Sequence, residues 1–216
     1  MKRKILFLLV VLILQLAAAQ VVVAQDDFEL KTGDLLFQVG GASSFNDAIK
    51  AVTSGAERLP FSHVGVAYIE GGEAYVLEAV PFGVMKNTLE SFFAHAQKYE
   101  DKPMVVVSRL KPRYAGIIDD AIESIQGMLG SRYDFVFAPD DDKFYCSEIV
   151  YESYIHKGRK LFKAKPMTFK DSTGELSPLW VKHFEMHKQP IPEGVDGTNP
   201  GDMSSSRKIE VVHRYY

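Results

Sequence analysis

Cysteine is almost absent from this sequence, because Cys146 is the only one in 216 residues. One thiol cannot form an intramolecular disulfide, so a fold held together by disulfides is excluded. Cys146 is therefore a buried inert side chain, half of an intermolecular bridge, or a reactive thiol. Its occurrence alone leaves all three interpretations open.

The sequence also lacks an excess of basic residues, an internal repeat and a glycine-rich phosphate loop. Its 25 lysines and arginines are outnumbered by 28 acidic residues, which gives a formal net charge of −3. No basic cluster follows the first four residues, so the chain has no electrostatic footprint for nucleic acid. The absence of repeats and of low-complexity linkers favours a single domain.

Long apolar runs are missing except at the N-terminus, which has the three parts of a secretory signal peptide. Residues 2–4 are basic, residues 5–16 are almost entirely apolar, and small residues follow them. We expect cleavage after Ala19 or after Ala24, and the sequence does not choose between the two. The alternative is an uncleaved membrane anchor, since residues 5–24 are almost long enough to span a bilayer.

Removal of this signal peptide leaves residues 25–216, enough for one domain with a substantial core. The formal charge then falls from −3 to −6, because three basic residues and no acidic residue are lost. Neither junction carries a cysteine, which argues against a lipid-modified N-terminus. We therefore expect an exported protein, periplasmic or extracellular in a bacterial host, that associates with the cell envelope. The sequence does not predict the oligomeric state.

Local patterns predict an α+β domain built on an antiparallel sheet packed with helices. The pair Gly71-Gly72, flanked by β-forming residues, is a strong signal for a β-hairpin. Strands are expected at 35–39, on both sides of this pair, at 103–110 and at 209–216; helices are expected at 44–52, 87–97, 114–129, 146–158 and from 178 onward; residues 189–206 are expected to be loop.

The hairpin around Gly71-Gly72 carries a chemically informative pattern. If Glu70 pairs with Glu73, alternation of side chains places His63 and Glu78 on one face, diagonally across the two strands. They are the only ionisable residues on an otherwise apolar face. A buried carboxylate needs a donor, and an imidazole that donates to it keeps its other nitrogen available as a base.

The hairpin also has a second interpretation. A one-residue slip in register would invert the two faces, and His63 and Glu78 would then be solvated residues at a sheet edge. The hairpin alone does not decide between these interpretations.

Cys146 stands where a helix is predicted to begin, in the segment "DKFYCSEIVYESY" (142–154). The unpaired N–H groups and the helix dipole at such a position favour a thiolate. Helical spacing puts Cys146 on the same inward face as Ile149 and Val150, and it turns Glu148 away. A thiolate at a helix start, a histidine on a strand and a carboxylate behind the histidine are the elements of a papain-like hydrolase.

These motifs resemble the YiiX/YebB-like branch of the NlpC-type cysteine hydrolases, in which the papain-like fold is circularly permuted and the histidine precedes the cysteine. The resemblance covers residues 31–160. It rests on "GDLLF" (33–37), "FSHVGVAY" (61–68), the acid at Glu78 and "YDFVF…KFYCSEIVYESY" (133–154), and "EGVDGTNPGDMSSS" (193–206) also looks like a C-terminal loop of that family.

The resemblance implies a permuted papain-like domain in which Cys146 is the nucleophile, His63 the base and Glu78 the acid that orients the base. The implied reaction is acyl transfer from an amide or ester, with N–H groups at the helix start stabilising the oxyanion. Tyr145 and Tyr68 are weaker predictions as residues that line the cleft, and buried packing positions are the alternative for both.

The implied substrates are cell-wall peptides, peptidoglycan fragments or N-acyl lipids, and no cofactor is implied. The alternative function is a non-catalytic protein of the same fold that binds a cell-wall or lipid ligand.

A metalloprotein is a third hypothesis, because His183 and His187 lie four residues apart on a predicted helix. The pattern is not His-Glu-x-x-His and no third ligand is evident, so the ordinary interpretation is an exposed polar helix face. Residues 140–142 are aspartates that lack the alternating acids and the glycine of a calcium loop, which indicates a solvated turn.

Overall fold

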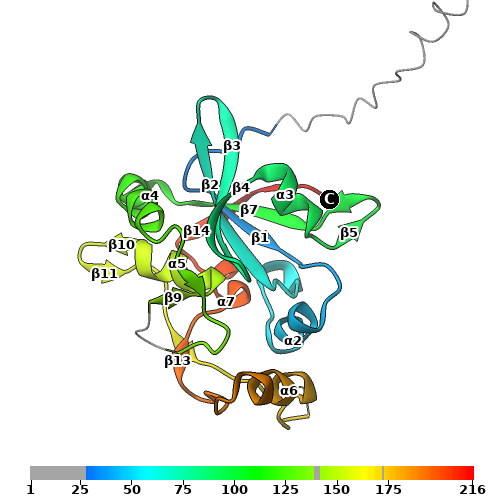
Figure 1. Ribbon diagram of the computed structural model, residues 1–216. Coiled ribbons are helices and arrows are strands. Elements are labelled where there is room, and N and C mark those ends of the chain that lie inside the picture. The colour runs from blue at the N-terminus through cyan, green and yellow to red at the C-terminus, as the bar shows by residue number, and fades with distance from the viewer. Residues whose placement is uncertain (1–27, 139–141, 172) are drawn as a thin grey trace, which may run out of the picture.

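The computed structural model describes residues 28–138, 142–171 and 173–216; the predicted signal peptide and the first two aspartates of 140–142 lie outside the described residues. Within them, six antiparallel strands form one central sheet in the order β14-β7-β1-β2-β3-β4 (Figure 1). The strands are β1 Leu35–Gln38, β2 His63–Glu70, β3 Glu73–Val80, β4 Gly83–Thr88, β7 Val105–Leu110 and β14 Ile209–Arg214. No helix in the described part of the chain is long and apolar enough to cross a membrane.

Helices and short strand pairs surround this sheet. The helices are α2 Ser44–Val52, α3 Leu89–Ala94, α4 Ile118–Gly127, α5 Cys146–Ser153, α6 Pro178–His187 and α7 Pro200–Ser204, with 3₁₀ turns at Ala56–Arg58 and Pro112–Ile117. The two-residue strands pair as β5 Lys98–Tyr99 with β6 Lys102–Pro103, β8 Arg132–Tyr133 with β9 Lys143–Phe144, β10 Ile155–His156 with β11 Arg159–Lys160, and β12 Lys165–Pro166 with β13 Asp196–Gly197.

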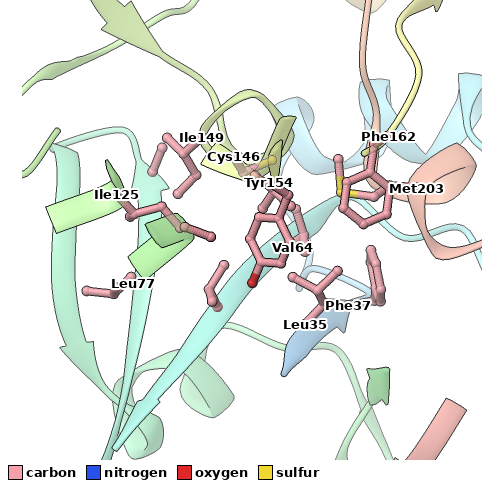
Figure 2. Close-up of a cluster of buried hydrophobic side chains, with 14 of the residues drawn as sticks. Leu35, Phe37, Val64, Leu77, Ile125, Cys146, Ile149, Tyr154, Phe162 and Met203 are labelled. Atoms are coloured by element: carbon pink, nitrogen blue, oxygen red, sulfur yellow. The ribbon is translucent and has the colours of Figure 1, made fainter. Parts of the chain in front are cut away.

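The core lies on both faces of the sheet, because alternate side chains of each strand point to opposite sides. Val64 and Leu77 pack on one face against Ile125 of α4 and Ile149 of α5 (Figure 2). The other face packs against Phe92 of α3. Figure 1 shows α4 and α5 on one side of the sheet and α3 on the other. A smaller apolar cluster joins α2 and α6 away from the sheet.

The predicted hairpin is present, whereas several predicted helices are longer than the observed ones. Glu70 pairs with Glu73, and Gly71 and Gly72 have φ angles of 60° and 86°, which glycine adopts without strain. The helix predicted over 87–97 begins only at Leu89 and ends at Ala94, because residues 83–88 form the edge strand β4.

Two further boundaries differ at the C-terminal end. The helix that starts at Cys146 ends at Ser153 and not near 158, because residues 155–160 form the hairpin of β10 and β11. The predicted loop 189–206 contains the short helix α7, since the Asn199 side chain accepts from the Asp202 N–H at 2.7 Å and caps it.

Candidate active site

His63 and Glu78 are in direct contact across the hairpin. His63, the first residue of β2, donates from Nε2 to Glu78 Oε2 at 2.5 Å. Asn87 of β4 donates from Nδ2 to the other carboxylate oxygen at 2.8 Å. Glu78 is only 4% exposed, so its oxygens are satisfied by protein donors. The alternative interpretation as solvated residues at a sheet edge is therefore wrong, and Asn87 is a partner that the sequence did not indicate.

Cys146 lies near His63 but packs on the opposite face of the sheet. It is the first residue of α5, is 4% exposed, and belongs to the cluster of Val64 and Ile149 (Figure 2). The His63 ring instead packs on Phe92, on the face covered by α3. The two side chains meet where β2 and α5 both begin, and the interaction with Cys146 is one cause of the raised pKa of His63. Because Nε2 is bound to Glu78, Nδ1 is the imidazole nitrogen left for the thiol.

The charged forms of His63 and Glu78 are stabilised by their neighbours in the site. Burial by itself lowers the pKa of His63, but hydrogen bonds to Cys146 and Glu78 and the charges of both raise the pKa to about 10. Burial raises the pKa of Glu78, but the bonds to His63 and Asn87 outweigh burial, so the pKa of Glu78 is lowered. Near neutral pH the imidazolium and the carboxylate are therefore the favoured forms.

A cavity of about 140 Å³ opens beside Cys146. Most of its wall is apolar and comes from Ile49 and Val52 of α2, Trp180 of α6, and Phe137, Met167 and Phe169. Polar residues at its edge include an ion pair between Lys165 Nζ and Asp202 Oδ1, 2.7 Å apart. The arrangement can hold an apolar group next to the thiol.

The two tyrosines predicted to line the cleft have different positions. Tyr145, directly before Cys146, is part of the cavity wall. The structure does not place Tyr68 there: its hydroxyl donates to the exposed Glu70 at 3.1 Å, because it lies near the hairpin turn and away from the start of β2.

Tyr133 is a site residue that the sequence analysis missed. It is on β8, which pairs with the strand that leads into Cys146, and it lines the cavity. Burial and then the charge of Cys146 raise the pKa of Tyr133. The hydroxyl therefore stays protonated and can donate to a group bound at Cys146. In the sequence, Tyr133 is marked only by its place in the segment "YDFVF", which is part of the family resemblance.

His183 and His187 do not form an exposed pair. Their ring centroids are 4.6 Å apart, but His183 is buried and its Nε2 donates to the Phe135 carbonyl at 2.7 Å. The interpretation of both as an exposed polar face is wrong for His183, because α6 packs this side against Phe45 of α2. Within the described residues, no group of three or more His, Cys, Asp or Glu side chains could hold a metal ion.

Comparison with known proteins agrees with the fold. Residues 29–213 match the model of a family described as permuted papain-like amidase enzymes, YaeF/YiiX, C92 family. The chain is 34% identical over 126 residues to the uncharacterized protein YiiX of Escherichia coli K12, and the alignment spans 57% of each chain. A crystal structure titled metalloprotein YiiX, from Escherichia coli O157:H7, superposes with a TM-score of 0.70 at 25% identity, covering 87% of this chain and 98% of that one. The predicted α+β, permuted papain-like fold is confirmed.

Proposed function

The chain belongs to the permuted papain-like amidases of the YaeF/YiiX family and is a cysteine hydrolase; we propose that Cys146 is its nucleophile, His63 its base and Glu78 the acid that orients the base. The hydrogen bond between Glu78 and His63, together with the interaction of His63 with Cys146 that raises the pKa of His63, carries this proposal. The choice of nucleophile has a second support, because a cysteine hydrolase needs a thiol and this chain has only one.

The proposed reaction is hydrolysis of an amide through a thioester. The Cys146 thiolate attacks the carbonyl carbon, and the oxyanion accepts from N–H groups of the first turn of α5. The His63 imidazolium then protonates the leaving nitrogen as the C–N bond breaks, which leaves the acyl group on sulfur. Water, deprotonated by His63, attacks the thioester, releases a carboxylic acid and restores the thiolate.

We assign the second oxyanion donor to the Tyr133 hydroxyl, which is protonated and lines the cavity beside the thiol. Tyr133→Phe removes only this hydroxyl. Unchanged turnover in that variant would mean that backbone N–H groups act without it.

The proposed substrate is an N-acyl amide whose acyl group is apolar. The cavity beside Cys146 has a largely apolar wall and a volume of about 140 Å³. That volume is close to the roughly 150 Å³ of a cavity that binds benzene, so the acyl group fits for about its first six carbons. Against Phe137, Phe169 and Trp180, an apolar acyl chain is more favourable than the polar amides and charges of a cell-wall peptide.

A panel of substrates tests this choice. N-acyl amides with one common amine and acyl chains of increasing length are compared with muropeptides at equal concentration. We expect kcat/KM to rise with chain length up to about six carbons and then to level off. Preferential cleavage of muropeptides would contradict the acyl assignment, and tight binding without product from either class would favour the non-catalytic alternative.

The place of action is also part of the proposal. An export signal over residues 1–24 would put the enzyme in the periplasm or outside the cell, where envelope lipids and wall fragments are available. N-terminal sequencing of the protein purified from its host distinguishes cleavage after Ala19, cleavage after Ala24 and an uncleaved anchor.

A metal-dependent function is supported less well. The similar Escherichia coli structure is titled a metalloprotein, but the described residues here do not supply a ligand group of three, and His183 Nε2 is already bound to a carbonyl. The proposed reaction therefore uses only the Cys146 thiol and the His63 imidazole.

Glu78→Gln is expected to lower kcat by about 10²- to 10⁴-fold and to shift the alkaline limit of activity. Glutamine keeps an acceptor for His63 but removes the negative charge, which is one cause of the pKa of about 10. The imidazolium needed to protonate the leaving nitrogen is lost as pH rises through its pKa, so the alkaline limit of kcat/KM moves to lower pH. Glu73→Gln, on the same strand but exposed beside the turn, is the control. A pH profile identical to wild type would show that another residue orients His63.

A further inference from the structure

Thr198 contacts both neighbours of Cys146 in the chain. Its backbone N–H donates to Tyr145 Oη at 3.0 Å, and its Oγ1 donates to Ser147 Oγ, also at 3.0 Å. These partners precede and follow Cys146 in the first turn of α5, more than 50 residues away from Thr198 in sequence. Tyr145 is 6% and Ser147 0% exposed, so water does not replace these bonds.

Thr198 is itself fixed by its surroundings. On one side of it, Asp196–Gly197 pairs with Lys165–Pro166. A Cβ on Gly197 would lie 2.4 Å from Met167 Sδ, so the Met167 side chain packs directly on this position. On the other side, Asn199 caps α7, and Asp202 of that helix forms the ion pair with Lys165. Residues 196–202 therefore form a fixed segment, which we call the cavity strap, and Thr198 is the strap residue bonded to both neighbours of Cys146.

We propose that Thr198 is a positioning residue that holds the first turn of α5, and with it the Cys146 thiol and N–H groups, in the geometry that acyl transfer needs. This inference rests on the proposed function. The first N–H groups of a helix have no partners within the helix, so their direction depends on how the first turn is held. Small displacements of reacting groups cost large factors in rate.

The rest of α5 does not depend on Thr198. Ile149 and Val150 are fully buried against the sheet and hold the helix body in place. Loss of the Thr198 hydroxyl therefore loosens the first turn without removing the helix. A purely structural role would instead lower stability and leave kcat of the folded protein unchanged.

The test uses Thr198→Val, which removes Oγ1 and keeps the backbone N–H. We expect kcat to fall about tenfold, the factor that corresponds to one ordinary hydrogen bond, with KM within about twofold. The pH midpoint of Cys146 alkylation by iodoacetamide should rise, because N–H groups of the first turn stabilise the thiolate. Thr198→Ser restores the hydroxyl and should restore both quantities.

Two further variants make the result specific. Ser147→Ala removes the acceptor of the shorter Oγ1 bond, while Thr198→Val also removes the bond from Oγ1 to Tyr145 Oη at 3.4 Å. The double variant should therefore lose no more activity than Thr198→Val alone. Thr32→Val is the matched control, because Thr32 Oγ1 accepts from the Ile69 N–H at 3.0 Å, which joins other parts of the fold. It should lower the melting temperature as much as Thr198→Val and leave kcat unchanged.

Wild-type kcat and alkylation in Thr198→Val would overturn the proposal. A loss that serine does not restore, or that is additive with Ser147→Ala, would overturn it equally. If the wild-type protein hydrolyses no amide or ester, the proposed function fails, but alkylation still reports on the first turn. An unchanged alkylation midpoint in Thr198→Val then rejects the role of Thr198 independently.

Discussion

Cys146→Ala loses hydrolysis by a factor of about 10⁴ or more and keeps the wild-type fold, as nucleophile replacement does in enzymes that form an acyl intermediate. The chain has no second thiol to substitute for it. The adjacent hydroxyl of Ser147 is buried and bonded to Thr198, so it is not free to attack a substrate. Steady-state hydrolysis of the best N-acyl amide, together with a thermal unfolding curve, measures both parts of this expectation.

Cys146→Ser tests whether a hydroxyl can replace the thiol in the same experiment. Serine keeps a nucleophilic atom in place, but its hydroxyl ionises far less readily than a thiol, so we expect it to be almost as inactive as alanine. Substantial activity in the alanine variant would mean that His63 activates water directly and that no thioester forms. Mass spectrometry of the wild-type protein during turnover should show the acyl group attached to Cys146.

The contact between His63 and Glu78 was predictable because a hairpin has a strict period of two. Gly71-Gly72 fixed the turn, and the turn fixed the register that puts both side chains on one face. Asn87 was not predictable, because it reaches Glu78 through β4. That edge strand has only two buried residues and begins with a glycine, so its sequence has little strand character.

The start of α5 was predictable, whereas the cavity beside it was not. Cys146 precedes residues with helical spacing, and this local signal was sufficient. The cavity wall combines α2, β12, α6 and the cavity strap, which are brought together only by tertiary packing. Composition even predicted loop for the strap, although Asn199 followed by Pro200 is an ordinary helix start.

His183 shows the limit of spacing arguments. Two histidines four residues apart share a face of a helix whether that face is exposed, buried or bound to metal. Only the packing of α6 on the aromatic cluster decided that His183 is buried and bonded to the Phe135 carbonyl.

His63→Gln is expected to lower kcat by a factor comparable to that of Cys146→Ala, because the general base and the acid for the leaving nitrogen are lost together. Glutamine is preferred to alanine because its amide can still donate to Glu78, which is buried and would otherwise keep only Asn87 as a donor. The variant therefore separates loss of chemistry from loss of stability.

The rate of Cys146 alkylation, measured as a function of pH, tests His63→Gln without a substrate. In the proposed pair the imidazolium is the group that stabilises a thiolate, and the pKa of His63 of about 10 keeps that cation present through neutral pH. Without it, the midpoint of the alkylation rate should move to higher pH. His156→Gln, a histidine of β10 whose ring packs against Tyr114, is the control and should keep the wild-type midpoint. An unchanged midpoint in His63→Gln would show that the start of α5 activates the thiol without His63, and the assignment of His63 as its partner would fail.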